Sequence, residues 1–453
     1  MENYIPIPQF YADRSVFVTG GTGFLGKALV EKLLRSCPDI KNIYLLIRQK
    51  RNQDIKTRLN DLLASEIFDS VRRENPEHLE KVIPISGDMT SDSLGLSESD
   101  QNILHENVSI VFHSAATIRF DEKLDVAVKI NVLGTKKMIE LSRKMIKLAA
   151  LVYVSTAYSN CDMFDISEII YPTLLDPNNI IALTNAMPEN LVELVTPILL
   201  DKKPNTYSFT KALAENLLNA ADDLPVMIVR PSIVISTLIE PIPGWLGSTS
   251  GTTRLVAEQG TGILRVIRTD KSKKVDVIPV DLVVNTLIVS AWRVGTSADK
   301  KLQVYNCVTG LEHGITYEYY FSECRNAMRK YYPNWEPYYS IMCKIFNDIP
   351  IYILDFMTWL KTGKNPRYIR LLKNYYQEAI EKNQRFFTAQ EWNFENTKFQ
   401  QLQNELNPND RSLFNMDITK ICWKTFLTDY VSGIEKILIR RRQRALASTG
   451  IKR

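Results

Sequence analysis

Residues 15–37 read SVFVTGGTGFLGKALVEKLLRSC, and this stretch decides the fold. A short apolar strand, VFV, leads through a glycine-rich turn into residues 29–34, where leucine and valine recur at helical spacing. Gly20, Gly23 and Gly26 are three residues apart, so the turn is tight and backbone N–H groups can approach a pyrophosphate at the start of the helix. We therefore predict a phosphate-binding strand, turn and helix. An ordinary glycine turn in an α/β protein is the alternative.

Strand-like and helix-like stretches alternate through the first half of the chain. The apolar runs lie at residues 43–47, 82–85, 109–112, 151–154 and 226–229, and helix-like segments such as 129–148 separate them. This order predicts an α/β fold with a doubly wound parallel sheet of the NAD(P)-binding Rossmann type. After the sheet region the sequence becomes aromatic-rich and helical. We expect a nucleotide-binding and catalytic domain at residues 10–310 and a mostly helical domain at residues 311–445.

The residue after the second strand indicates which dinucleotide binds. An acidic residue about 20 positions past the glycines takes a ribose 2′-hydroxyl, whereas an arginine there accommodates a 2′-phosphate. Here the strand at residues 43–47 ends in Arg48, with Lys50 and Arg51 following and no acid until Asp54. The sequence therefore predicts NADPH as the cofactor. The alternative is that Arg48 is merely solvated at a strand end.

Composition excludes several other classes of protein. The 453 residues carry a net charge of +5 with 24% charged residues, so nothing points to a nucleic-acid partner. The six cysteines and four histidines form no metal-binding spacing. We expect a metal-free, reduced protein that faces the cytosol.

The segment NTYSFTKALAE, residues 205–215, carries the strongest chemical signal. It places Tyr207 and Lys211 one helical turn apart on the same face. A free phenol has a pKa near 10, and an ammonium within about 4–6 Å favours its phenolate. We therefore predict that Lys211 lowers the pKa of Tyr207 and also holds the nicotinamide ribose. The alternative is an ordinary pair on a surface helix.

Two further segments complete a candidate catalytic site. LVYVSTAYSN, residues 151–160, ends a strand with Ser155 and Thr156, at the edge where an open α/β sheet places its ligands. We expect Thr156 to stabilise a carbonyl oxygen that Tyr207 protonates. Asn131, in KINVLGTKKM, is expected to anchor a water chain that returns protons to Lys211. With the glycine loop, these segments predict a carbonyl reductase.

Eight motifs occur along the chain in a fixed order: TGGTGFLG (19–26), LLIR (45–48), GDM (87–89), HSAA (113–116), NVLGTKKM (131–138), VSTAY (154–158), YSFTKALAE (207–215) and IVRPSIV (228–234). With this set, the chain resembles the extended short-chain dehydrogenase/reductases, and most closely their fatty acyl-CoA reductase branch. The resemblance runs from about residue 10 to 440.

This resemblance implies NADPH-dependent reduction of a long-chain acyl-CoA to a primary alcohol, with release of coenzyme A and an aldehyde-level intermediate. It assigns Tyr207 and Lys211 as the catalytic pair and Thr156 as their hydroxyl partner. It also implies a cofactor site: a pyrophosphate loop of Gly20, Thr22, Gly23, Phe24, Leu25 and Gly26, Arg48 at the 2′-phosphate, Asp88 at the adenine, and Ala115 and Ala116 lining the cleft.

Two other functions stay open. One is an extended-family hydroxysteroid dehydrogenase or a nucleotide-sugar epimerase or dehydratase. The other is a protein that binds NADPH without turnover.

The carboxyl-terminal sequence indicates a possible contact with membrane. Apolar residues between Trp423 and Leu438 fall on one helical face, and four arginines follow within residues 440–444. Such a helix either lies in a membrane interface or packs on the protein. Many members of the family end in an apolar helix, whereas residues 438–453 read LIRRRQRALASTGIKR. We expect an intracellular protein, peripheral on the endoplasmic reticulum, with the peroxisome as the alternative.

Overall fold

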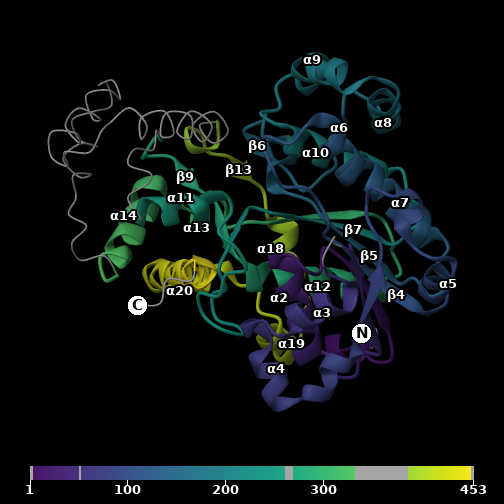
Figure 1. Ribbon diagram of the computed structural model, residues 1–453, viewed down its shortest axis with the longest axis horizontal. Helices are drawn as coiled ribbons and strands as arrows, with labels where there is room; N and C mark the ends of the chain where they lie inside the picture. The colour runs from purple at the N-terminus through teal and green to yellow at the C-terminus, as the bar shows by residue number, and fades with distance from the viewer. Residues whose placement is uncertain (1–3, 50–52, 261–268, 332–385, 450–453) are drawn as a thin grey trace. The chain divides into compact units, whose positions relative to one another are not determined.

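A computed structural model describes residues 4–49, 53–260, 269–331 and 386–449 (Figure 1). The chain forms two compact units, each assembled from three segments. The sheet unit comprises Met1–Ser248, Asp276–His313 and Trp392–Cys422, and the helical unit comprises Thr249–Val275, Gly314–Glu391 and Trp423–Arg453. The domain bounds expected at residues 10–310 and 311–445 stay a prediction.

The sheet unit is built on seven parallel strands in the order β11-β7-β5-β4-β1-β2-β3. Every residue of β1, β4, β5 and β7 is buried, as expected for a parallel sheet that helices cover on both faces. The predicted fold class is therefore confirmed. The strands are β1 (Ser15–Thr19), β2 (Asn42–Ile47), β3 (Val82–Ser86), β4 (Val108–His113), β5 (Ala150–Val154), β7 (Val226–Pro231) and β11 (Gln303–Cys307).

Helices cover this sheet in two layers (Figure 1). On one side α12 packs on β5, β7 and α2, and elsewhere α7 packs on β4, α5 and α10. The helices of the sheet unit are α1 (Ile7–Tyr11), α2 (Phe24–Ser36), α3 (Ile55–Leu63), α4 (Asp69–Glu74), α5 (Glu98–Asn107), α6 (Leu124–Ala127), α7 (Gly134–Arg143), α8 (Pro177–Ala186), α9 (Glu189–Leu200), α10 (Thr206–Asn219), α12 (Val280–Thr296), α13 (Gly310–His313), α18 (Thr397–Asn404) and α19 (Pro408–Leu413).

Shorter elements connect these parts. A π-helical turn, η4 (Val128–Leu133), joins α6 to α7. The helix expected at residues 129–148 therefore starts earlier and ends at Arg143, because the chain turns there and buries Met145 in the core. The other short elements of the sheet unit are η1 (Glu66–Phe68), η2 (Pro76–Lys81), η3 (Asp92–Gly95), η5 (Ala157–Asn160), η6 (Ile418–Lys420), β6 (Asp165–Ile166) paired with β13 (Asn393–Phe394), and β8 (Ile233–Ile235) paired with β10 (Val277–Pro279).

In the described part of the helical unit, α11 (Gly251–Gly260), α14 (Tyr317–Met328) and α20 (Trp423–Thr449) pack on one another, and β9 (Lys274–Val275) pairs with β12 (Ile315–Thr316). The apolar face of α20 is largely buried in this packing, at Phe426, Leu427, Tyr430, Val431 and Ile434. Of the two alternatives for this helix, the structure shows the packed one for these residues. No helix in the described ranges is long and apolar enough to span a bilayer.

Candidate active site

The predicted site residues of the sheet unit lie where the parallel strands end. Gly20 follows β1, Arg48 follows β2, Asp88 follows β3 and Thr156 follows β5, while Ala115 and Ala116 follow β4. The carboxyl ends of parallel strands meet at one edge of a sheet, where α/β proteins bind their ligands. The fold thus brings these residues to a common edge.

The glycine loop is shaped by close backbone contacts. Gly20 has a φ of +74°, and a Cβ there would lie 2.8 Å from the backbone nitrogen of Ala115. A Cβ on Gly26 would lie only 2.3 Å from the carbonyl oxygen of Gly20. Gly23 is the N-cap of α2, and no side chain caps this helix. The backbone N–H groups of the first turn are therefore available to donate to a ligand.

An aromatic contact supports this loop from outside. The ring of Phe24 lies 5.4 Å from that of Trp245, centroid to centroid. A Cβ on Gly247 would come within 2.8 Å of the Phe24 ring, so the chain passes close to the loop there as well. Phe24 is therefore a packing residue of the loop. Thr22 and Leu25 are half-buried beside it.

Three side chains gather at the ends of β2 and β3. The Nε of Arg48 lies 3.8 Å from the Oδ2 of Asp88, and the Arg48 side chain is 63% exposed. Asp88 also accepts a bond of 2.9 Å from the backbone of Thr90. Arg58 on α3 donates to the backbone carbonyl of Arg48. Arg58 was not predicted from the sequence, although an arginine on the helix that follows a basic strand end is a signal for a phosphate site.

Thr156 and Tyr207 face each other across the site. Thr156 is the N-cap of η5 and is 5% exposed, and Tyr207 lies in the first turn of α10. Asn205 caps this helix through a bond of 2.9 Å from the Ser208 N–H, which fixes where α10 begins. A hydrogen bond between the two hydroxyls favours the phenolate, but burial outweighs it and raises the pKa of Tyr207 to about 12.

Lys211 is buried and directed at β5. Its Nζ donates to the carbonyl of Val154 at 2.6 Å and to the hydroxyl of Tyr153 at 3.2 Å. Burial lowers the pKa of Lys211 to about 7, and the charge of Glu215 opposes this shift. Burial raises the pKa of Tyr207, and the contact that opposes this shift comes from Thr156. An effect of Lys211 on the pKa of Tyr207 stays a prediction.

Asn131 lies in the π-helical turn η4, 1% exposed. Its side-chain amide accepts from the Thr117 N–H at 2.9 Å and donates to the Thr117 carbonyl at 3.1 Å and to the Thr210 hydroxyl at 2.9 Å. Its backbone carbonyl accepts from the Thr135 hydroxyl at 2.7 Å. Asn131 therefore ties the loop after β4 to α10. Its role in a water chain stays a prediction.

Polar side chains inside the buried strands form contacts that the sequence analysis did not foresee. Arg230 of β7 and Glu215 of α10 form an ion pair at 2.6 Å, with side-chain exposures of 0% and 1%. His113 of β4 bonds to Thr19 at 2.8 Å and Thr135 at 3.1 Å. A charged or polar residue in a fully buried strand needs a partner, so these positions could have been singled out from the sequence.

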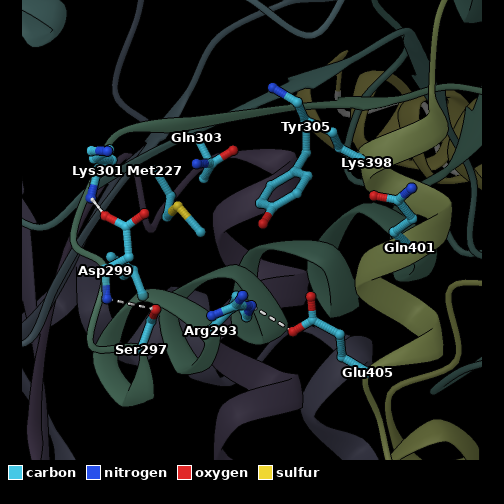
Figure 2. Close-up of a pocket in the computed structure, with 11 residues that line it drawn as sticks. Met227, Arg293, Ser297, Asp299, Lys301, Gln303, Tyr305, Lys398, Gln401 and Glu405 are labelled. Carbon is cyan, nitrogen blue, oxygen red and sulfur yellow. Dashed lines mark hydrogen bonds and ion pairs between the residues drawn. The ribbon is translucent and has the colours of Figure 1, made fainter.

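A polar hollow of about 240 Å³ lies apart from these residues (Figure 2). Its lining includes Met227 and Gln303, which pair at the amino ends of β7 and β11, opposite the edge that carries Thr156. Figure 2 shows Arg293 paired with Glu405 across the hollow. The Nε of Arg293 lies 2.5 Å from the Oε2 of Glu405. None of the predicted catalytic residues lines this hollow.

Solved structures with the same fold include reductase domains. The terminal R domain of the myxalamid biosynthetic pathway superposes with a TM-score of 0.61 at 19% identity, covering 93% of this chain and 90% of that one. The reductase domain of a non-ribosomal peptide synthetase from Mycobacterium tuberculosis gives 0.60 at 20% identity, covering 94% and 92%. At these identities the likeness establishes the fold.

Sequence comparisons establish the family. Two family models, both described as male sterility protein, match residues 18–287, as an NAD-binding region, and residues 346–441. Fatty acyl-CoA reductase 1 of Mus musculus is 35% identical, covering 98% of this chain and 88% of the relative. Fatty acyl-CoA reductase wat of Drosophila melanogaster is 36% identical, covering 96% and 86%. This chain therefore belongs to the fatty acyl-CoA reductases, a family of oxidoreductases whose sheet unit binds a nicotinamide cofactor.

Proposed function

We propose that this protein reduces a long-chain fatty acyl-CoA to a primary alcohol at the expense of two NADPH and two protons, releasing coenzyme A. The observation that carries the proposal is the facing pair Thr156 and Tyr207, with Lys211 one turn further along α10, at the edge of the sheet where the glycine loop ends. The relatives named fatty acyl-CoA reductase supply the class of substrate.

The residues present fit NADPH, a nicotinamide adenine dinucleotide phosphate. The uncapped start of α2 and the close-packed glycines suit a pyrophosphate. Arg48 and Arg58 suit a 2′-phosphate, because guanidinium groups form paired, charge-assisted bonds to phosphate oxygens. Asp88 lies next to Arg48 and suits the adenosine end of the cofactor, with Ala115 and Ala116 as the wall of the cleft.

When bound, the cofactor supplies a hydride to the carbonyl carbon. In the first step Thr156 stabilises the developing oxyanion and Tyr207 donates its phenolic proton, giving a hemithioacetal. The hemithioacetal returns its hydroxyl proton to the Tyr207 phenolate as the carbon–sulfur bond breaks, which leaves an aldehyde and a coenzyme A thiolate that takes a proton from solvent. In the second step, with a second NADPH bound, the same two hydroxyls stabilise and protonate the aldehyde oxygen as the aldehyde carbon takes the second hydride, giving the alcohol. Lys211 would hold the cofactor ribose and restore the proton that Tyr207 has given to the alcohol.

The test is a stoichiometric assay of the purified protein with NADPH and a series of saturated acyl-CoAs. NADPH oxidation is followed by absorbance, free thiol by a thiol reagent, and alcohol and aldehyde by gas chromatography. We expect two NADPH oxidised and one thiol released per alcohol formed. One NADPH per thiol, with free aldehyde as the product, would contradict reduction to the alcohol.

The other candidate functions give different results in the same assay. A hydroxysteroid dehydrogenase, epimerase or dehydratase leaves every acyl-CoA intact and releases no thiol. A binding protein retains NADPH without oxidising it.

We further propose that the enzyme acts at the cytosolic face of the endoplasmic reticulum. Cell fractionation tests this location and would find the protein with that membrane.

A further inference from the structure

Tyr153 lies beneath the catalytic lysine and has no part in the mechanism above. It is the fourth residue of β5 and is 1% exposed. The Nζ of Lys211 lies 3.2 Å from its hydroxyl and 4.5 Å from the centroid of its ring. Tyr153 therefore meets the lysine with both its polar end and its aromatic face.

The Tyr153 hydroxyl is the acceptor in its bond of 3.2 Å with Lys211, because an ammonium has hydrogens and no lone pair. The ring of Tyr153 lies 5.4 Å from the ring of His113, centroid to centroid. His113 is in turn bonded to Thr135. A threonine hydroxyl has one hydrogen, and Thr135 gives it to the carbonyl of Asn131 at 2.7 Å, so Thr135 accepts from the Nε2 of His113 at 3.1 Å.

His113 is held in the tautomer in which its Nε2 donates to Thr135. Thr19 accepts from the Ala115 N–H at 3.1 Å, and its hydroxyl lies 2.8 Å from the Nδ1 of His113. The Nδ1 accepts the hydrogen of Thr19, and the Nε2 carries the ring hydrogen to Thr135. Burial lowers the pKa of His113 to about 3, so the ring is neutral at physiological pH.

We propose that Tyr153 is a positioning residue for Lys211: its hydroxyl accepts from the Nζ of Lys211, and its ring packs against His113, which Thr19 and Thr135 hold in place. The inference rests on the proposed function, in which the ammonium of Lys211 binds the cofactor ribose and restores the proton of Tyr207. An acceptor at the Nζ favours the charged amine and keeps it directed at β5.

Other charged and titratable groups around Lys211 do not replace this acceptor. Glu215, one turn further along α10, favours the ammonium, but both its oxygens are bonded to Arg230 of β7. Tyr207 on α10 and His113 on β4 are neutral at physiological pH. The bonds to Tyr153 and to the Val154 carbonyl therefore carry much of the stabilisation of the buried charge.

The first measurement is the titration of Lys211 in the cofactor-free protein. Lysine labelled with carbon-13 at Cε is followed by NMR, and the Lys211 signal is assigned by its loss in Lys211→Met. We expect Tyr153→Phe to move the midpoint of Lys211 to lower pH by about one unit, the effect of losing one hydrogen bond to a charged group. Thr135→Val should shift it in the same direction, and Thr135→Ser should restore the wild-type midpoint.

The second measurement is the pH profile of kcat/KM for acyl-CoA. Its basic limb should move to lower pH in Tyr153→Phe and Thr135→Val, but not in Tyr331→Phe, an exposed control in the helical unit. A folded Tyr153→Phe protein whose Lys211 midpoint and basic limb both match wild type overturns the inference. If Tyr153→Phe does not fold, the Thr135→Val and Thr135→Ser pair decides in the same way.

Failure of the proposed function gives a different result. If Lys211→Met retains full turnover of acyl-CoA, or wild type has no turnover, the catalytic proposal falls. The NMR titration still shows whether Tyr153 holds Lys211. If Lys211→Met is inactive while Tyr153→Phe titrates as wild type, the catalytic proposal stands and the positioning role falls.

Discussion

The guanidinium of Arg58 donates a hydrogen bond to the backbone carbonyl of Arg48, and this joins α3 to the end of β2. Burial and the neighbouring charge of Arg48 lower the pKa of Arg58. Two like charges near one another repel, and an anion placed between them relieves the repulsion. The pair is thus suited to a phosphate that NADPH has and NADH lacks.

Replacing either arginine should change cofactor preference. We expect Arg48→Ala and Arg58→Ala each to raise the KM for NADPH about 10- to 100-fold, the loss of one charge-assisted bond, with little change for NADH. Steady-state kinetics with both cofactors tests this. Arg143→Ala, which removes an exposed arginine paired with Asp223, serves as the control. Equal effects on the two cofactors would reject the 2′-phosphate assignment.

Substitution should separate the contributions of the Thr156 and Tyr207 hydroxyls to kcat. Tyr207→Phe should keep NADPH affinity and lower kcat at least 100-fold, since general-acid catalysis contributes about 10² to 10⁴. Thr156→Val should also cost about 100-fold or more in kcat, and Thr156→Ser should recover much of it. Cofactor binding is measured by fluorescence and turnover by alcohol formation. Near-normal turnover in Tyr207→Phe would remove the phenol from the mechanism.

The protonation of Lys211 should set the alkaline side of the pH profile. Burial lowers its pKa to about 7, so the ammonium is present below that pH and is lost above it. The pKa of Tyr207, raised to about 12, leaves the phenol protonated throughout. We expect kcat/KM for acyl-CoA to fall as pH rises through about 7, measured at saturating NADPH. A rate that keeps rising to about pH 9 contradicts this assignment.

The glycine loop should tolerate substitution unequally. A Cβ on Gly26 would lie 2.3 Å from the Gly20 carbonyl oxygen, whereas one on Gly23 would lie 3.1 Å from the same atom. Gly26→Ala should therefore destabilise the protein by about 1–3 kcal/mol and abolish cofactor binding. Gly23→Ala should have smaller effects on stability and on cofactor binding than Gly26→Ala. Thermal unfolding and NADPH titration measure the two effects, and the reverse order would contradict the loop geometry.

Local patterns were enough to predict the sheet and most of the candidate site. The apolar runs at residues 43–47, 109–112 and 226–229 all lie in strands, because a strand buried on both faces leaves a continuous apolar signal. Glycines at fixed spacing predicted the loop before α2. The order of parallel strands then placed Arg48 and Thr156 at one edge without any knowledge of their side-chain contacts.

Contacts between distant segments could not be predicted in this way. The spacing of Tyr207 and Lys211 showed that they share a helical face, but not that Lys211 bonds to Tyr153, 58 residues earlier in the chain. Nor did it reveal that desolvation dominates the pKa of Tyr207. Burial depends on what packs around a residue, and that is a property of the whole fold.

The ion pair between Glu215 and Arg230 makes the candidate catalytic residues depend on a contact in the protein interior. It joins α10, the helix that bears Tyr207 and Lys211, to β7, the neighbour of the edge strand β11, and Arg230 also donates to the carbonyls of Ser167 and Ile169. Loss of one partner of a buried pair is strongly destabilising. A substitution at either residue would therefore look like an active-site mutation in an activity assay, although its cause is a loss of folded protein.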